Sequence, residues 1–398
     1  MKTWKIGVVG ARRGKTFISL LQTMGEQAVL HAICEYNEKN AAVAREMAPE
    51  GVKIYADYDE FLDSGLDAVI LCDCFHQHAA NAMKAMNKGI HVMSETTAAP
   101  TLGECVALCR TVEKTKAKYM LGANVPFKKG IQFMRKQVEE GKLGHLVYGE
   151  AEYLHFNPNP IPYADNNFHW RRKLPGTYYN MHSLGPLMYA TNTVPKKVTA
   201  HAIFNDPYVK RLNKLNDEVG ALSLVTMDND AVFNVTGCST YGPTSKWFRL
   251  IGDNGTLETQ RYDETKVIFA SSGDEFIPGD PIPELEIHQP EYADLNMPAD
   301  VQPTDEQMKL GHNGIDFWLL VYFIKYLNGE HEPFFNVYRA VALSAAGILG
   351  WRSVLNQSKE YTIPDFSNEE ERKAYENDFL SPFEDEDSPN YISRCTIR

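Results

Sequence analysis

Two patterns of apolar and polar positions divide the chain. Over the first 125 residues, short apolar runs typical of buried strands alternate with stretches whose apolar residues have helical spacing. Strands are predicted at residues 4–9, 28–34, 68–72, 90–93 and 118–123, and helices at 16–24, 38–47, 78–87 and 101–115. This alternation predicts a doubly wound parallel sheet with right-handed crossovers, an α/β domain of the Rossmann type over residues 1–125.

From residue 146 onward the pattern changes to longer strands with strict alternation. Strands are predicted at residues 147–156, 197–204, 219–227, 231–238, 247–251 and 256–260, after a helix at 128–140. They indicate an open, largely antiparallel sheet in a second, α+β domain spanning residues 126–366, which we expect to bind substrate and to oligomerise. Two apolar helices, at 313–327 and 337–355, are expected to pack on this sheet or back onto the first domain.

Two long loops, rich in proline and asparagine, interrupt the second domain at residues 157–165 and 278–303. Loops of this length in compact enzymes usually serve sites or interfaces. The chain has no internal repeat.

The charge of the chain is −12, and much of it is local. Between Glu369 and Asp387 nine acidic residues stand against Arg372 and Lys373, a net charge of −7. We expect an acidic tail over residues 367–398 that is mobile or wraps a neighbouring subunit. An acidic chain lacks the basic surface that phosphate backbones require, so nucleic-acid binding is not expected.

The cysteines and the N-terminus indicate a cytoplasmic protein. Seven cysteines, an odd number, lie mostly in predicted strands and helices, as reduced thiols do. None of their spacings matches a zinc module, so no metal site is expected. The chain enters a strand at once, with neither a signal peptide nor a membrane-spanning segment expected.

The first strand-to-helix turn carries a partial nucleotide-binding pattern, Gly10-Ala11-Arg12-Arg13-Gly14. Glycines in such a turn let backbone amides approach a pyrophosphate at the start of a helix. The full G-x-G-x-x-G pattern is absent, because Arg12 stands where a second glycine would be expected. A plain tight turn explains these residues equally well.

Glu35 strengthens the nucleotide interpretation. It ends the second predicted strand, 21 positions beyond Gly14, which is the spacing at which a carboxylate accepts hydrogen bonds from a dinucleotide ribose. A helix-capping or solvated glutamate is the alternative. A carboxylate here would repel a 2′-phosphate, which favours NAD over NADP. Arg12 and Arg13 favour NADP mildly, although they can equally neutralise the pyrophosphate.

Three further strand ends complete a family resemblance: Asp73 to His78, Ser94-Glu95-Thr96-Thr97, and Gly122-Ala123-Asn124. With the turn and Glu35, they make the first domain similar to that of the Gfo/Idh/MocA oxidoreductases. The resemblance implies that Asp73, His78, Glu95, Thr96 and Asn124 surround the cofactor. His78 either orders its turn or touches the substrate.

One residue departs from the family pattern. In these enzymes a lysine follows the glutamate at position 95, lies beside the nicotinamide, and often helps to move the substrate's hydroxyl proton. Thr96 takes that place here. A neutral hydroxyl cannot act as a base near pH 7, so another group must take the proton.

The second domain contains the segment Tyr179-Asn180-Met181-His182-Ser183-Leu184-Gly185-Pro186. In the family, a histidine at this helix start lies at the substrate, and His182 occupies its position. The segment also resembles Tyr-x-x-His-x-x-Gly-Pro of the NAD-dependent glycosidases acting on α-N-acetylgalactosaminides, which lack the lysine as well. Asn180 and Met181 differ from that branch, so its sugar specificity does not carry over.

These residues predict roles in acid–base chemistry. A neutral imidazole, with an ordinary pKa of about 6.5, suits His182 as the base that removes a hydroxyl proton. Tyr179 is the second candidate, and a nearby cation would have to lower its pKa from about 10. A sugar subsite is expected from four residues near this segment and a fifth in the loop 311–314; for each of them core packing or solvation remains an alternative. These five are Tyr153, His155, Trp170, Arg171 and His312.

Three functions remain open at this stage. The first is an NAD-dependent oxidoreductase that removes hydride from a ring carbon of a sugar or sugar derivative, and the abundance of dehydrogenases in the family favours it. The second is a redox-neutral glycosidase that oxidises, eliminates, hydrates and reduces, which the missing lysine and the Tyr-x-x-His segment favour. The third and most remote is a dinucleotide-binding regulator without activity. A homo-oligomer, dimer or tetramer, is expected through the open face of the second sheet.

Overall fold

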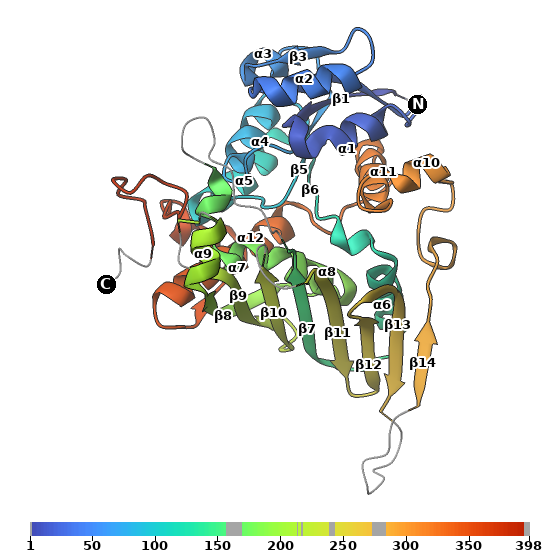
Figure 1. Ribbon diagram of the computed structural model, residues 1–398, viewed down its shortest axis with the longest axis vertical. Coiled ribbons are helices and arrows are strands. Elements are labelled where there is room, and N and C mark those ends of the chain that lie inside the picture. Colours follow the sequence, from blue (N-terminus) through green and yellow to red (C-terminus); the bar gives the residue numbers. More distant parts are fainter. Residues whose placement is uncertain are drawn as a thin grey trace, which may run out of the picture. The chain divides into compact units, whose positions relative to one another are not determined.

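A computed structural model of the 398-residue chain describes residues 2–156, 169–212, 214–215, 218–238, 243–272 and 284–393 (Figure 1). The chain forms two compact units, and each is built from discontinuous segments. Unit 1 comprises residues 1–127, 300–341 and 365–379, and unit 2 comprises residues 128–299, 342–364 and 380–398. The predicted loop at 157–165 and Cys395 lie outside the described residues, as does part of the loop at 278–303.

Unit 1 contains a six-stranded, all-parallel sheet of order β3-β2-β1-β4-β5-β6. The strands are β1 (Trp4–Val9), β2 (Ala28–Cys34), β3 (Lys53–Tyr55), β4 (Ala68–Leu71), β5 (His91–Ser94) and β6 (Tyr119–Leu121). The strand order reverses between β1 and β4, which is where ligands bind in open α/β sheets. The Rossmann prediction is confirmed.

Helices follow the strands of unit 1 in alternation. They are α1 (Ala11–Leu21), α2 (Glu38–Met47), α3 (Tyr58–Leu62), α4 (His78–Asn87) and α5 (Leu102–Thr115). The strands between them are buried on both faces: Ile6, Val8 and Val69 have no exposed surface. Their continuous apolar sequence is therefore that of a covered parallel sheet rather than of an amphipathic one.

The apolar helix α11 (Ile315–Asn328) belongs to unit 1, together with α10 (Asp305–Lys309) and the 3₁₀ helix η1 (Val125–Phe127). Phe127 packs against Tyr322 with ring centroids 5.1 Å apart, and Trp4 donates a hydrogen bond to Asn328 at 2.8 Å. The predicted second domain is therefore not one continuous stretch. An apolar helix has no periodicity that shows which unit it packs on, so the sequence left this choice open.

The expected acidic tail needs correction, because its first part is ordered against unit 1. Here α13 (Glu369–Arg372) and η4 (Lys373–Tyr375) lie beside α5. Arg372 is buried and pairs with Glu113 of α5 at 2.6 Å, and Arg110 of α5 pairs with Glu376 at 2.8 Å. Complementary charges on α5 hold this segment in place.

Unit 2 contains a nine-stranded sheet of order β14-β13-β12-β11-β7-β10-β9-β8-β15. Among the described strands of this sheet, only β7 and β10 pair in parallel, so the prediction of a largely antiparallel sheet is confirmed. The strands are β7 (Leu146–Leu154), β8 (Pro195–Phe204), β9 (Glu218–Met227), β10 (Val232–Cys238), β11 (Ser245–Gly252), β12 (Gly255–Gln260), β13 (Asp263–Ser271), β14 (Leu285–His288) and β15 (Tyr361–Thr362).

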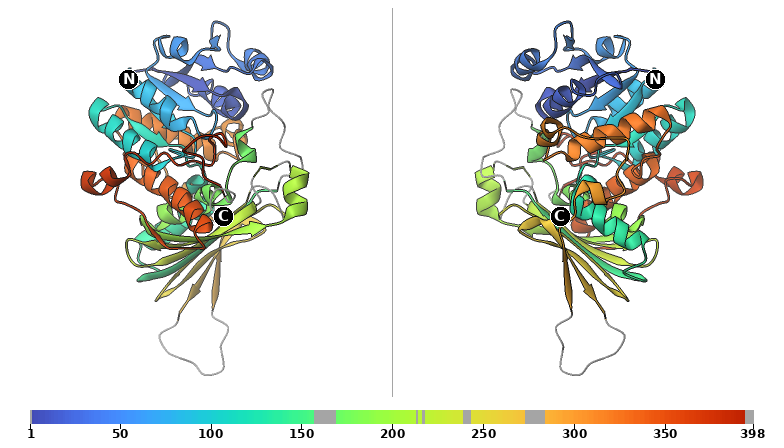
Figure 2. Two further views of the ribbon diagram at one scale, coloured as in Figure 1. Left: turned by 90° about the vertical axis from the view of Figure 1, so that its left-hand side faces the viewer. Right: turned by 90° about the vertical axis from the view of Figure 1, so that its right-hand side faces the viewer.

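Helices, among them α6, α8 and α12, cover one face of this sheet (Figure 2). The helices of unit 2 are α6 (Lys129–Glu139), η2 (Trp170–Arg172), α7 (Gly176–Tyr179), α8 (Met181–Thr191), α9 (Asp206–Leu212), η3 (Tyr292–Asp294) and the greater part of α12 (Val337–Leu355). Strand β7 shows the consequence: Gly149, Ala151 and Tyr153 are buried under the helices, and the residues between them are partly exposed. In the described part of the chain no helix is long and apolar enough to cross a membrane.

Candidate functional site

The glycine turn of unit 1 is built for close approach of backbone. Gly10 has φ +82, and a Cβ there would lie 2.6 Å from the carbonyl oxygen of Cys72. The Gly14 amide donates to the Gly10 carbonyl at 2.9 Å, and a Cβ on Gly14 would lie 2.6 Å from Val8. Helix α1 therefore starts directly at the end of β1, with glycine required at both positions.

Glu35 lies at the same turn. Its side chain is buried, one carboxylate oxygen accepts from the Ala11 amide at 2.8 Å, and the other accepts from the Asn37 amide at 2.8 Å. Each carboxylate oxygen has a second lone pair that can accept a ribose hydroxyl. The turn and the acidic residue predicted for NAD are thus brought together, and their donors and acceptors fit a dinucleotide.

The two arginines of the turn have different environments. Arg12 is exposed, whereas Arg13 pairs with Glu95 at 2.6 Å and donates two hydrogen bonds to Asp316 at 3.0 and 3.1 Å. Burial alone would lower the pKa of Arg13, but the charges of Glu95 and Asp316 outweigh it and raise the pKa. Arg13 therefore pairs with carboxylates. The exposed Arg12 is the arginine of this turn that can bind a phosphate.

Asp316 is a residue that sequence reasoning missed. It has no exposed surface and accepts hydrogen bonds from Arg13, from Asn124 Nδ2 at 2.9 Å and from His312 Nδ1 at 2.9 Å. Burial raises its pKa, but the hydrogen bond from His312 and the charge of Arg13 lower it to about 2. Asp316 is the only acidic residue of the mostly apolar α11, and this was the signal available in the sequence.

The loop before α11 presents His312. Residues 311–314 all have positive φ, from +47 at Gly311 to +87 at Gly314, and His312 itself has φ +50. A Cβ at Gly311 would lie 2.5 Å from an Asp316 carboxylate oxygen, so the loop folds tightly over that group. His312 was predicted for the sugar, and Asn124 and Glu95 for the cofactor. The structure joins all three in one network around Asp316 and Arg13.

Thr96 follows Glu95 after β5 and is partly exposed. Its amide donates to Glu95 Oε2 at 3.3 Å, and the Thr96–Thr97 peptide bond is cis. A hydroxyl therefore stands where the family has its lysine.

Asp73 lies in the turn that follows β4, and His78 begins α4. His78 is buried, its Nδ1 is 2.9 Å from the Thr97 carbonyl oxygen, and its Nε2 is 3.6 Å from Asp73. Burial raises the pKa of Asp73, which also accepts from Asn81 at 2.6 Å. These contacts tie α4 to the segment after β5, as expected of a histidine that orders its turn.

In unit 2, three of the predicted site residues form one cluster. The His182 ring stacks on Tyr153 with centroids 4.8 Å apart and meets Tyr179 edge-on at 4.9 Å. The ring centroids of Tyr153 and Tyr179 are 5.8 Å apart. The three come from β7, the end of α7 and the first turn of α8, so the fold unites residues that are distant in sequence.

A glycine of the sheet allows this cluster to pack closely against the strands. Gly237 of β10 is the register partner of Tyr153, and a Cβ there would lie 2.2 Å from the Asn180 side-chain oxygen and 2.7 Å from its backbone nitrogen. Asn180 also donates to Ser223 of β9 at 2.7 Å. Asn180, which differs from the glycosidase pattern, thus anchors the junction of α7 and α8 to the strands beneath.

The remaining sugar-subsite candidates surround the cluster. His155 is exposed, with its ring 6.4 Å from Tyr153, and the Arg171 guanidinium lies over Trp170 at 4.3 Å. Burial raises the pKa of Tyr179, although the charge of Arg171 and a hydrogen bond from it act in the opposite direction. Tyr179 therefore remains a protonated phenol at neutral pH, which does not favour the base role considered for it.

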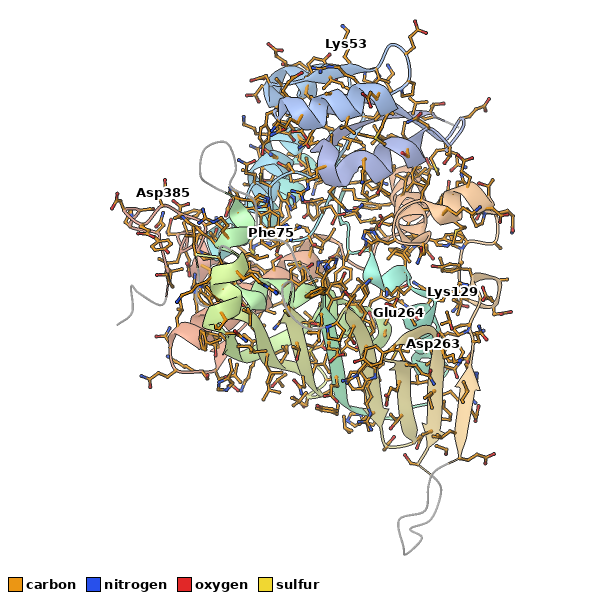
Figure 3. The ribbon with its side chains drawn as sticks, in the orientation of Figure 1. Lys53, Phe75, Lys129, Asp263, Glu264 and Asp385 are labelled. Carbon is orange, nitrogen blue, oxygen red and sulfur yellow. The ribbon has the colours of Figure 1, made fainter. Side chains whose placement is uncertain are left out.

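Two lysines of unit 2 with notable surroundings were not predicted. Lys246 is the register partner of Tyr153 on β11, and its Nζ lies 5.5 Å from the Tyr153 ring. Lys128 pairs with Glu264 of β13, which is labelled in Figure 3. Burial and the charge of Lys246 lower the pKa of Lys128 to about 8. Lys246 lies on the same face of the sheet as Tyr153 because the two residues are paired on neighbouring strands. The sequence of β11 alone does not show which strand lies beside it.

Comparison with known proteins agrees with both units. The sequence model described as "Oxidoreductase family, NAD-binding Rossmann fold" matches residues 4–123. Over these residues the chain is similar to the Gfo/Idh/MocA oxidoreductase family. The family's C-terminal domain matches residues 131–258, and "Glycosyl hydrolase 109, C-terminal domain" matches residues 224–372. The predicted resemblance is confirmed, including its glycosidase side.

Curated relatives and solved structures extend the comparison. The chain is 25% identical to "Glycosyl hydrolase family 109 protein" of Shewanella sp. (strain W3-18-1), over 92% of this chain and 86% of the relative. It is 26% identical to such a protein of Shewanella sp. (strain MR-4), over 78% and 72%. Levoglucosan dehydrogenase in complex with NADH and L-sorbose shares the fold, with TM-score 0.75 and 17% identity over 92% of this chain and all of that one.

Proposed function

We propose that this protein is an NAD-dependent oxidoreductase acting on a sugar or sugar derivative at a ring carbon. The cluster of Tyr153, Tyr179 and His182 is the observation that carries the proposal. It places an imidazole between two aromatic rings in a chain whose other unit has an NAD-binding Rossmann fold. Aromatic faces suit the C–H surface of a sugar, and imidazole suits proton transfer near neutral pH.

The residues of unit 1 suit NAD. The Gly10 turn would receive the pyrophosphate, Arg12 would offset its charge, and Glu35 would accept hydrogen bonds from the adenosine ribose. When bound, NAD supplies the acceptor for the hydride of the oxidised carbon. Glu35 would repel a 2′-phosphate, which supports NAD rather than NADP.

The residues of unit 2 supply the acid–base chemistry. His182 removes the hydroxyl proton, the task that the family gives to a lysine at the position of Thr96. Tyr179, kept protonated by burial, donates a hydrogen bond to a sugar oxygen, and Arg171 holds the phenol in place. Tyr153, His155 and Trp170 line the sugar subsite.

A redox-neutral NAD-dependent glycosidase is the second candidate. Two observations favour it: the curated relatives carry the glycosyl hydrolase 109 name, and Thr96 replaces the lysine. In this reaction the oxidised sugar loses the proton of the adjacent carbon, the substituent at carbon 1 leaves, water adds, and the ketone is reduced again. A dinucleotide-binding regulator is the remote third candidate, and the retained His182 and Tyr179 count against it.

Aryl glycosides in heavy water test these candidates. A dehydrogenase should accumulate NADH at 340 nm and leave the glycosidic bond intact. The glycosidase should release the aglycone without NADH accumulation and place deuterium at carbon 2 of the sugar. If a broad panel of sugars and glycosides gives neither result while NAD binds, the regulator becomes the better account.

We also propose a cytoplasmic homo-oligomer. Support for the location comes from the described cysteines, all of which are free thiols. Support for association comes from the uncovered face of the unit 2 sheet, where Leu224 and Val232 are 44% and 37% exposed. Symmetric association commonly buries such a surface.

A further inference from the structure

Unit 2 holds positive charge beside its aromatic cluster that the proposed acid–base chemistry does not use. Lys246 of β11 lies opposite Tyr153 of β7 in the sheet, and its Nζ is 5.5 Å from the centroid of the Tyr153 ring. The His182 ring stacks on the same tyrosine at 4.8 Å. The ammonium and the imidazole, both in unit 2, are therefore separated by no more than the span of one sugar and the hydrogen bonds at its two ends.

The charge of Lys246 is not balanced by an ion pair. Among the residues that the structure describes, no carboxylate lies within ion-pair distance of its ammonium. The nearest acidic residues along β7, Glu150 and Glu152, alternate with Tyr153 and so lie on the other face of the sheet. Glu152 pairs there with Arg261 at 3.5 Å. The face that carries Tyr153 therefore keeps the positive charge of Lys246.

A second ammonium group lies close enough to interact with this charge. The side chain of Lys128, which precedes α6, is 15% exposed and pairs with Glu264 of β13. Burial lowers the pKa of Lys128 and the charge of Lys246 lowers it further, to about 8, although Glu264 acts in the opposite direction. In the described part of unit 2, one carboxylate thus balances two interacting ammonium groups, which leaves a net positive charge.

This arrangement is unfavourable without a ligand. Like charges repel, and removal of Lys128 from solvent penalises its charged form. Strongly perturbed ionisable groups of this kind cluster at functional sites. A negatively charged group held by both ammonium groups would remove the repulsion between Lys128 and Lys246 and would raise the pKa of Lys128 again.

A third cation acts on the other tyrosine of the cluster. The charge of Arg171 and a hydrogen bond from it lower the pKa of Tyr179 against the larger effect of burial. Both tyrosines that contact His182 therefore have a cation as a neighbour, Lys246 at Tyr153 and Arg171 at Tyr179. A binding site with one sign of charge attracts ligands of the opposite sign and disfavours those of the same sign.

We propose that Lys246 and Lys128 form a subsite for a negatively charged substituent of the sugar, a carboxylate or a phosphate. The substituent accepts hydrogen bonds from both ammonium groups, while the sugar ring lies against Tyr153 and His182. This assignment rests on the proposed function, which puts a sugar at the cluster, and it makes the substrate a sugar acid or a sugar phosphate. It holds for oxidation and for redox-neutral hydrolysis alike, since neither reaction consumes the charge.

Binding without turnover tests the subsite. Methyl hexosides of the gluco, galacto and manno series are compared with the hexuronides and the hexoside 6-phosphates, which differ from them at carbon 6 alone. Calorimetry measures each dissociation constant for the wild-type protein in excess NADH, which cannot accept a hydride, so the sugar stays intact. We expect one anionic form to bind about tenfold more tightly than its neutral counterpart or better, as hydrogen bonds to charged groups provide. The form that does so distinguishes a carboxylate from a phosphate.

Variants of the lysines connect this preference to the subsite. Lys246→Gln should reduce the preference for the anionic form by about tenfold, and Lys128→Gln should act in the same direction. Lys246→Arg keeps the positive charge and should retain most of the preference. Lys197→Gln is the matched control, because Lys197 is a half-exposed lysine of β8, at the other side of the same sheet, and should leave every dissociation constant unchanged.

Three results would overturn the assignment. Equal binding of neutral and anionic forms to the wild-type protein would refute the subsite and leave the proposed function intact. A preference that persists in Lys246→Gln would show that the charged group binds elsewhere. If none of the glycosides binds and none yields NADH when NAD is supplied, the proposed function itself is refuted, and the subsite with it.

Discussion

Single side chains in this protein take their chemistry from their surroundings in the fold. Tyr179 shows this most clearly. The sequence analysis required a nearby cation to lower its pKa, and Arg171 acts in that direction, yet burial is the larger effect and raises that pKa. The phenol therefore acts as a hydrogen-bond donor rather than as a base.

Tyr179→Phe tests that role. Loss of one hydrogen bond to the sugar should lower kcat/KM by about two- to tenfold, which corresponds to the 0.5–1.5 kcal/mol of a typical neutral hydrogen bond. Because the phenol stays protonated, the pH–rate profile of the variant should have the same shape as that of the wild type. A loss of several thousandfold, or the disappearance of a basic limb in the profile, would restore Tyr179 as a base.

Asp316 gives a prediction for acid stability. Its pKa is lowered from 3.8 to about 2 on folding, so the stabilisation it provides is complete above pH 3.8 and is lost as the pH falls toward 2. Asp316→Asn leaves Arg13 without part of its partner and should cost about 3 kcal/mol at pH 6. Urea unfolding at stepped pH should show this difference shrinking between pH 4 and pH 2. The exposed Asp305→Asn is the control, and a difference that does not change with pH would contradict the assignment.

At the scale of elements, a glycine in a strand allows a helix junction to approach the sheet closely, and this approach determines where the site residues lie. Gly237 allows the junction of α7 and α8 to rest directly on β10, and this junction positions Tyr179 and His182 beside Tyr153. The sequence shows the alternation of each strand but not which strands become neighbours. For this reason the register partners Tyr153, Gly237 and Lys246 could not be grouped in advance.

Gly237→Val tests the close packing of the α7–α8 junction on β10. Its side chain would overlap Asn180, including the backbone nitrogen, and should destabilise the protein by about 1–3 kcal/mol while reducing turnover strongly. NAD affinity should stay unchanged, because the glycine turn and Glu35 lie in unit 1. Thr236→Val, one residue away and on the other face of β10, is the matched control. Full activity in Gly237→Val would show that the α7–α8 junction does not position the site.

The elements themselves were predictable wherever the apolar pattern was long and regular. Strands β1 and β2 and helices α2, α4 and α12 have the predicted bounds. Short or polar elements were not predicted. Strand β3 has only three residues, and β14 at the sheet edge has largely exposed side chains, so neither shows an apolar pattern. The nucleotide turn and the Tyr179–His182 segment were found because each is local in sequence. The Asp316 network was missed because its members come from four separate segments.

At the scale of the whole molecule, the chain crosses between its two units several times. The sequence predicted the first boundary near residue 125, and the structure has it after Phe127. The return of α11 and of residues 365–379 to unit 1 was not predictable, since charge pairs such as Arg372–Glu113 depend on positions in space.

Association between copies is the prediction at this scale. Leu224→Lys combined with Val232→Lys places two charges on the uncovered face of the unit 2 sheet and should convert a dimer or tetramer into a smaller species, measured by light scattering. Tyr262→Lys alters an exposed aromatic residue outside the strands and should leave the mass unchanged. A wild-type monomer would refute the proposed oligomer.

Chemical rescue at position 182 tests the account as a whole most directly. His182→Ala should bind NAD with unchanged affinity and form NADH from the best sugar substrate about 10²–10⁴-fold more slowly in a single turnover, because the proton acceptor is missing. Added imidazole should restore part of this rate in proportion to its neutral form. NADH formation at the wild-type rate in His182→Ala, with or without imidazole, would contradict the claim that this imidazole takes the proton in place of the absent lysine.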